Sequence, residues 1–163
     1  MQQKQITNTP EIAEQFRLPP EGRILALDPG TRRVGVAVCD PLRVTARPVE
    51  TIERRSWKAL LAKVASLVRD FDAVAVVVGL PLASDGGESQ MSIEARSMAR
   101  KFTLSLSVPV FLQDERVTSY EAKRRLWEQG ASLAETRERV DSEAAAVILE
   151  DFLSVLDSQP ATE

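Results

Sequence analysis

The hydrophobic pattern of the chain changes its period once. Short apolar or alternating runs come first, and they predict strands at residues 23–27, 34–39 and 47–52. The Pro-Gly turn of residues 29–33 predicts that the first two strands form an antiparallel hairpin. From residue 57 onward, apolar positions at helical spacing alternate with short apolar runs.

The middle of the chain is therefore expected to alternate helices with strands. Helical spacing predicts helices over residues 57–71, with Ser56 as the N-cap, and over residues 91–106. Apolar runs at 73–78 and 108–112 predict two more strands, the first of them covered on both faces.

Two further helices are expected toward the C-terminus. Thr118 and Glu121 fit a capping box, which predicts a helix that ends near Gly130. A last helix is predicted from about Asp141 to Leu156. Three hairpin-like strands followed by strand-helix alternation predict an α/β domain, with a mixed sheet and helices on its faces.

The length of 163 residues suits one domain with a substantial core. We expect a flexible N-terminal extension over residues 1–21, a folded domain over 22–156 and a disordered tail over 157–163. The sequence has neither a signal-peptide pattern nor an apolar run of the roughly 20 residues that span a bilayer. Its single cysteine, Cys39, suits a reducing compartment, and the predicted location is cytoplasmic.

Composition removes several kinds of chemistry. The chain contains no histidine and one cysteine, which excludes Ser-His-Asp and Cys-His catalysis and closed zinc sites. The net charge of -3 argues against a strongly basic nucleic-acid binder. Any catalysis would use carboxylates, hydroxyls, amines or a hard cation that oxygen atoms hold.

Three acidic residues stand at the ends of predicted elements. Asp28 ends the first strand, Glu115 follows the strand at 108–112, and Asp141 opens the predicted last helix. Sites in open α/β sheets gather beyond the carboxyl ends of strands, so adjacent first and fourth strands would bring Asp28 and Glu115 together. Three acids at one place repel unless a cation neutralises them, and oxygen ligands suit Mg²⁺ or Mn²⁺. Two such ions can hydrolyse a phosphodiester.

Each carboxylate also has a simpler interpretation. Asp28 precedes Pro-Gly and could serve only the turn, while Asp141 could be only a helix N-cap. Glu115 could pair with Arg116. Cys39 is expected to be a small core residue.

Several polar segments could contact phosphate. Arg32 and Arg33 could touch a nucleic-acid backbone or be ordinary charges at a turn. The loop GLPLASDGGESQ could cradle phosphate with its N–H groups and the helix N-terminus that follows, or be a plain surface loop. The basic run at 123–125 is expected to be a solvated helix face.

Four motifs in order carry a family resemblance: DPGTRRVGVAVCD, VVGLP with a glycine-containing loop, QDERVTS and VDSEAAAVILEDFL. Together they resemble the YqgF family, RuvC-like proteins that are described as Holliday junction resolvases and as pre-16S rRNA nucleases. The resemblance runs from about residue 23 to 156. It implies an RNase H-like mixed five-stranded sheet with helices on both faces.

The resemblance also implies roles for single residues. The family's acidic residues fall on Asp28, Glu115 and Asp141, which would bind two Mg²⁺ or Mn²⁺ ions, with Asp28 bridging both. Glu143 stands where the family often has a hydrophobic residue. The first-motif glycines match Gly30 and Gly35, and the candidate substrate-binding set is Arg32, Arg33, Gly79, Pro81, Arg116 and Thr118.

By this resemblance the chain is a hydrolase, a metal-dependent endonuclease that cleaves phosphodiesters and leaves a 5′-phosphate and a 3′-hydroxyl. The preferred substrate is the 5′ end of precursor 16S rRNA in ribosome biogenesis. RNA is then preferred over DNA, precursor ribosomal particles are expected partners, no membrane is involved, and the protein is a monomer or homodimer. The alternative is Holliday junction resolution, which needs two active sites and hence a dimer.

Two other classes of function stay open. DPGTRRVGVAV also resembles the first phosphate loop of the actin and hexokinase superfamily, but those proteins need two such domains around the nucleotide. A non-catalytic RNA- or ribosome-associated factor would suit the acidic net charge, because nucleic-acid affinity rests largely on phosphate neutralisation. The intact acidic residues argue against that factor.

Overall fold

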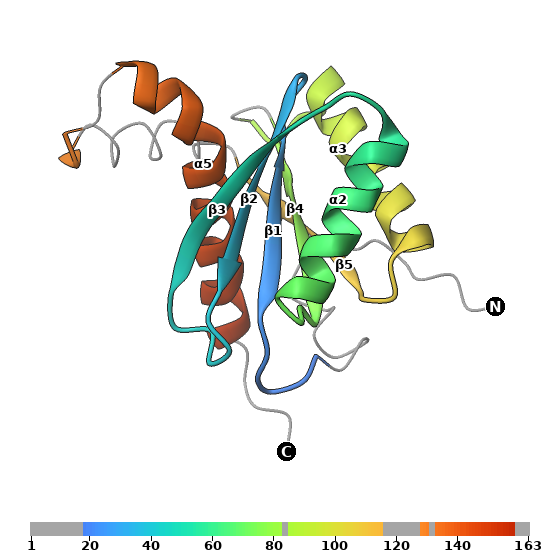
Figure 1. The fold of residues 1–163 in the computed structure, drawn as a ribbon, viewed down its shortest axis with the longest axis vertical. Helices are drawn as coiled ribbons and strands as arrows, with labels where there is room; N and C mark the ends of the chain where they lie inside the picture. The colour runs from blue at the N-terminus through green and yellow to red at the C-terminus, as the bar shows by residue number, and fades with distance from the viewer. Residues whose placement is uncertain (1–17, 83–84, 116–127, 131–132, 159–163) are drawn as a thin grey trace.

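A computed structural model describes residues 18–82, 85–115, 128–130 and 133–158. Its centre is a five-stranded sheet in the order β3-β2-β1-β4-β5 (Figure 1). β1 pairs antiparallel with β2 and parallel with β4, β2 pairs antiparallel with β3, and β4 pairs parallel with β5. The strands are β1 (Ile24–Pro29), β2 (Arg33–Cys39), β3 (Ala46–Glu53), β4 (Ala75–Leu80) and β5 (Val110–Asp114).

Helices cover both faces of the sheet. α2 (Trp57–Asp70) and α3 (Gln90–Ser105) lie on one face, and α5 (Leu133–Asp157) lies on the other (Figure 1). Alternate residues of β1 supply both cores, since Leu25 and Leu27 pack toward α2 and α3 whereas Ile24 and Ala26 pack toward α5. The predicted mixed sheet with helices on both faces is confirmed.

Local signals in the sequence account for the starts of two helices. The Ser56 hydroxyl accepts a hydrogen bond from the N–H of Ala59 at 3.1 Å, which caps α2 where the sequence predicts. Ser89 and Ser92 form a reciprocal capping box at the start of α3. Cys39 is 2% exposed, as expected of a small core residue, and its sulfur accepts from the N–H of Ile24.

The last helix begins earlier than the sequence pattern predicts. α5 starts at Leu133, eight residues before Asp141, because LAETRERV consists of helix-compatible residues without Gly or Pro. Asp141 therefore lies about two turns inside the helix, and its interpretation as an N-cap is wrong. The helix predicted from Thr118 lies outside the described residues, apart from its last three positions.

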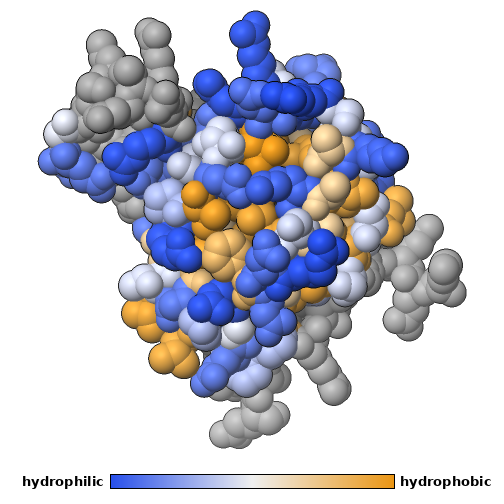
Figure 2. Space-filling view, viewed as in Figure 1, coloured by the Kyte–Doolittle hydropathy of each residue, from blue (hydrophilic) through white to orange (hydrophobic). Residues whose placement is uncertain are grey.

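The surface differs between the two ends of the sheet. Hydrophilic atoms dominate the upper end in Figure 2, over the β1–β2 turn and the start of α2. Hydrophobic atoms gather at the lower left, over the turn between β2 and β3, where Leu42 and Val44 are exposed. In the ranges that the structure describes, no helix is both long and apolar enough to cross a membrane.

Candidate active site

Two of the predicted acidic residues meet at the carboxyl end of the parallel strands. Asp28 lies near the end of β1 and Glu115 follows β5, with β4 between these two strands. The side chains of Asp28 and Glu115 are hydrogen-bonded to each other across β4. β1 and β4 are neighbours, as the prediction for Asp28 and Glu115 requires.

A glycine on β4 makes room for this pair. A Cβ atom on Gly79 would lie 2.9 Å from Glu115 Oε2 and 2.5 Å from Ile148 Cδ1 of α5. Both contacts are too close for a real side chain, so any larger residue would displace the Glu115 carboxylate. The backbone of Glu115 is also fixed, because its N–H donates to the Leu80 carbonyl at 3.1 Å.

A second glycine brings the third acidic residue to the same edge. Gly35 of β2 is the register partner of Asp28, and a Cβ on Gly35 would overlap the carbonyl oxygen of Asp141. The α5 backbone therefore rests directly on β2 at this point. Arg33 Nε donates to Asp141 Oδ2 at 3.2 Å, so the turn that follows β1 also holds the helix carboxylate.

The electrostatics of the site favour a bound proton or a cation. Burial raises the pKa of Asp28 to about 6, and the charge of Asp141 adds to this increase. Burial, the charge of Asp28 and the hydrogen bond to Asp28 raise the pKa of Glu115 to about 10. Glu115 is thus the donor in the pair, and the two carboxyls share a proton at neutral pH.

The three acidic side chains have the donor atoms that a divalent cation prefers, but they are not arranged as a metal-ligand cluster. Across the described segments, no three Asp, Glu, Cys or His side chains form such a cluster. Asp28 and Glu115 face each other, whereas Asp141 pairs with Arg33. Their oxygen atoms are nevertheless the donors that Mg²⁺ prefers, and a cation would offset the burial and the mutual repulsion that raise the two pKa values.

The candidate substrate-binding residues have different surroundings. Arg32 is exposed at the tip of the hairpin, while Arg33 contacts Asp141. The Pro81 carbonyl accepts from the Ser89 hydroxyl at 3.4 Å. Gly79 packs under Glu115, a role that sequence reasoning missed. The predictions for Arg116 and Thr118, and for the basic run at 123–125, lie outside the described residues.

The loop before α3 is a weaker phosphate site than its sequence suggests. The N–H groups of Ser89 and Ser92 are each bonded to the hydroxyl of the other residue, at 2.7 and 3.2 Å. Glu88 adds a negative charge beside them and pairs with Arg96 at 2.7 Å. Two N–H groups that a phosphate would need as hydrogen-bond donors are therefore already bonded within the protein.

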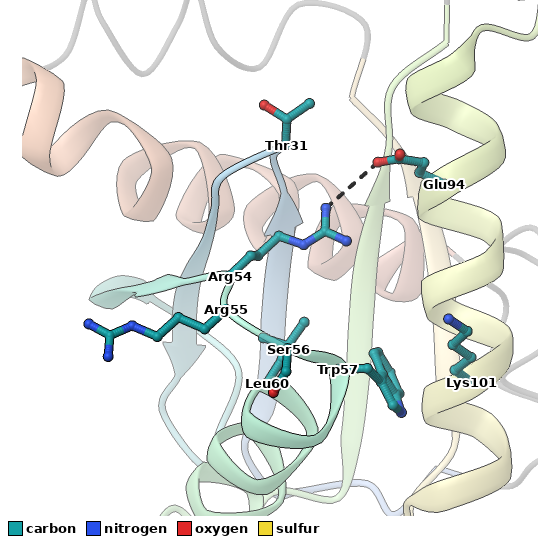
Figure 3. A pocket seen from close by; sticks show the side chains of 8 residues that line it. All are labelled: Thr31, Arg54, Arg55, Ser56, Trp57, Leu60, Glu94 and Lys101. Atoms are coloured by element: carbon teal, nitrogen blue, oxygen red, sulfur yellow. Dashed lines mark ion pairs between the residues drawn. The ribbon is translucent and has the colours of Figure 1, made fainter.

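A basic pocket lies beside the β1–β2 turn, between the start of α2 and α3 (Figure 3). It has a volume of about 340 Å³. Arg54 projects into it, donates to the Gly30 carbonyl at 2.8 Å and pairs with Glu94 at 3.6 Å. Sequence reasoning missed this pocket, because its lining comes from three separate segments: Thr31, Arg54, Arg55, Ser56, Trp57, Leu60, Glu94 and Lys101.

Comparison with protein families gives one match over most of the chain. The model of the RuvX family, described as Holliday junction resolvase, matches residues 22–155. A relative from Anaeromyxobacter sp. (strain Fw109-5), named "Putative pre-16S rRNA nuclease", is 45% identical over 131 residues, which cover 80% of this chain and 96% of the relative. A relative of the same name from Koribacter versatilis (strain Ellin345) is 42% identical over 132 residues, 81% of this chain and 86% of its own.

Two solved structures share the fold. RuvC of T. thermophilus, in complex with a Holliday junction substrate, aligns with a TM-score of 0.53 and 16% identity over 84% of this chain and 96% of its own. The Fowlpox virus resolvase, in complex with Holliday junction DNA, aligns with a TM-score of 0.51 and 12% identity over 82% and 98%. At these identities the likeness concerns the fold alone, and it confirms the predicted RNase H-like sheet.

Proposed function

Because the chain belongs to the RuvX family, which is the YqgF family that its motifs resemble, we propose that it is a metal-dependent endonuclease acting on nucleic-acid phosphodiesters. The substrate we favour is RNA at the 5′ end of precursor 16S rRNA, within precursor ribosomal particles. Relatives with the pre-16S rRNA nuclease name support this choice, since they align over nearly their whole length. One observation carries the proposal: a buried carboxyl pair, Asp28 and Glu115, lies at the carboxyl end of the sheet beside Asp141.

We assign Asp28, Glu115 and Asp141 as the residues that hold Mg²⁺ or Mn²⁺. When bound there, such a cation neutralises charge on the phosphoryl oxygens and makes a coordinated water more acidic. Asp28 is suited to the role of the main ligand, because β1 is paired with a strand on each side and this pairing fixes the carboxylate. Carboxylate ligands must be deprotonated, so the proton shared by Asp28 and Glu115 leaves before both can act as ligands.

Arg33 is placed both to pair with Asp141 and to contact an incoming phosphate. In the structure it holds Asp141 at 3.2 Å, and half of its own side chain is exposed (51%). A phosphate that approaches the acidic residues would meet this guanidinium first. Arg33 is therefore placed to exchange a carboxylate partner for a phosphate partner as substrate binds.

Holliday junction resolution is the second candidate function. The description of the matching family supports it. A junction has two strands to cut, so this activity needs a homodimer with two active sites, whereas the trimming of rRNA is possible for a monomer. The choice between the two functions is therefore testable with the substrate and with the oligomeric state.

A cleavage assay with purified full-length protein tests the proposal. Substrates are a 5′-end fragment of precursor 16S rRNA, an unrelated single-stranded RNA and a four-way DNA junction, each with Mg²⁺, Mn²⁺ or EDTA. We expect metal-dependent cleavage of the precursor fragment, abolished in Asp28→Asn and retained in Glu21→Gln, an exposed acid that lies away from the site.

Three other results would contradict the proposal. Cleavage of the junction alone would establish the second candidate. Binding of RNA without any cleavage would identify a non-catalytic factor. Full cleavage by Asp28→Asn would remove the acidic residues from the mechanism.

A further inference from the structure

The basic pocket beside the β1–β2 turn has the composition of an anion site. Three of its lining residues are cations, namely Arg54, Arg55 and Lys101, and one is an acid, Glu94. Glu94 is paired with Arg54 and Arg55 is paired with Glu53, so Lys101 is the lining cation whose charge no carboxylate of the described residues offsets. Arg55 has a side chain that is 81% exposed and pairs only at the surface, with Glu53 at 3.2 Å.

The start of a helix adds to the positive potential. Ser56 and Trp57, the N-cap and first residue of α2, line the pocket. The positive end of the α2 dipole therefore faces the same space as the cations. Lys101 reaches it from α3 and lies 5.2 Å from the centre of the Trp57 ring.

The Trp57 ring lines the pocket, but it is not placed to stack on a nucleobase. One contact of the ring is with Phe102 in the core, at 4.8 Å between centroids, and another is with Lys101. The pocket therefore offers charge and hydrogen-bond donors and lacks a free aromatic face. This chemistry suits a phosphate group better than a nucleobase.

The pocket and the acidic residues share one short turn. Thr31 lines the pocket only three residues after Asp28, and Arg54 Nη1 donates to the carbonyl of Gly30 between them. Three residues of extended chain span at most about 11 Å. The pocket therefore lies within a few nucleotides of Asp28 along a bound strand.

We propose that the pocket binds a backbone phosphate of the substrate strand, a few nucleotides to one side of the bond that lies at Asp28 and Glu115. This inference rests on the proposed nuclease function and adds a positioning subsite to it. Lys101 neutralises the phosphate and the exposed Arg55 adds to the positive potential at the rim, while Arg54 links the pocket to the turn that carries Asp28. The same phosphate chemistry could also come from a free nucleotide or inorganic phosphate, and the test separates these sources.

The test compares two double variants that lose the same charge. Arg55→Gln/Lys101→Gln removes two of the cations that line the pocket. The control Lys58→Gln/Arg100→Gln removes two exposed cations, one from α2 and one from α3, at positions that do not line the pocket. Binding of a labelled single-stranded RNA is measured in EDTA at several salt concentrations, and thermal unfolding verifies that both variants fold.

We expect the pocket variant to bind RNA about tenfold more weakly than the control variant. Its slope of log K against log salt should also be shallower by about 0.7, because each phosphate contact on a single strand contributes about that much and the pocket binds one phosphate. Equal affinities and slopes for the two variants would overturn the inference. Saturable binding of inorganic phosphate or a nucleoside monophosphate that only the pocket variant loses, with unchanged RNA binding, would assign the pocket to a free phosphate and also overturn it.

Cleavage by the wild-type protein is measured separately, so that the two proposals fail independently. RNA binding that depends on the pocket, in a protein that cleaves nothing, supports the subsite and refutes the nuclease function. Metal-dependent cleavage with equal RNA binding by both double variants supports the nuclease function and refutes the subsite.

Discussion

Gly35 of β2 and Asp141 of α5 touch so closely that no side chain fits between them. A Cβ on Gly35 would overlap the Asp141 carbonyl oxygen and lie 2.8 Å from the N atom of Ser142. Gly35 is also paired with Asp28 across the hairpin. The glycine therefore fixes the distance between a strand carboxylate and a helix carboxylate through backbone contact alone.

Gly35→Ala should harm both the fold and the site, because the obstacle is helix backbone that cannot rotate away. Overpacking of this kind costs about 1–3 kcal/mol of unfolding free energy. A shift of Asp141 by about 1 Å should reduce cleavage roughly a hundredfold. Thermal unfolding and the cleavage assay measure the two effects. In the control Gly87→Ala, the added methyl meets only the movable side chain of Asp85, and both properties should stay near wild type.

The acidic pair should make the metal-free protein less stable as pH rises. Asp28 and Glu115 have raised pKa values, so above their ordinary values of 3.8 and 4.5 the folded chain keeps protons that the unfolded chain has released. The unfolding free energy therefore falls from about pH 4 through the folded pKa of Asp28, about 6, and further toward that of Glu115, about 10.

Asp28→Asn should reverse this loss, even though the same substitution is expected to abolish cleavage. Without the second charge Glu115 can ionise at lower cost, so the Tm in EDTA at pH 7.5 should exceed that of wild type. Each kcal/mol regained corresponds to about 2–4 °C. Glu21→Gln removes a charge elsewhere and should leave the pH profile unchanged. An Asp28→Asn protein that is less stable than wild type from pH 5 to 8.5 would contradict the electrostatic explanation.

The sheet was predictable because its signals are local. The alternating residues of β2 and the continuous apolar run of β4 each identify a strand and its burial. Asp28 and Glu115 were recognisable as candidate site residues, since each stands at or just after the end of such a run. Their mutual hydrogen bond follows from the strand order, which no single segment encodes.

Two features were beyond local reasoning. The first two turns of α5 lack a clear apolar stripe, so the pattern placed the helix start at Asp141 where the buried stripe begins. The basic pocket forms only when the loop that precedes α2 packs against α3 and the β1–β2 turn. Arg54, the residue that joins these parts, has no motif around it that would identify it in the sequence.

Arg33→Gln should change metal binding and nucleic-acid binding in opposite directions. Arg33 neutralises Asp141 when no metal is bound, so its removal should leave a more negative site that binds Mn²⁺ more tightly. The same change removes a cation that faces the incoming phosphate and should weaken RNA binding. Calorimetric titration with Mn²⁺ and RNA binding in EDTA measure the two effects. Arg32→Gln, one residue away on the same turn, should not increase Mn²⁺ affinity, and equal Mn²⁺ affinities for the two variants would refute this role of Arg33.

Arg139 should stabilise α5 through its ion pair with Glu143. Glu143 is 6% exposed, and its Oε1 atom lies 3.5 Å from Arg139 Nη2, while the Arg139 side chain is 47% exposed. Breaking a fully buried pair costs 3–5 kcal/mol and breaking a surface pair at most about 1. Arg139→Gln should therefore destabilise the protein by about 1–2 kcal/mol, measured by urea unfolding.

The second substitution distinguishes a lost ion pair from lost packing. Glu143→Gln removes the buried charge, so Arg139→Gln/Glu143→Gln should recover most of the stability that Arg139→Gln loses. Glu143→Leu should be at least as stable as wild type, because an apolar residue of similar size avoids the desolvation of a carboxylate. If the double variant instead loses the sum of the two single losses, the pair contributes nothing and Arg139 acts through another contact, such as the hydrogen bond that it donates to Gln129 Oε1 at 3.4 Å.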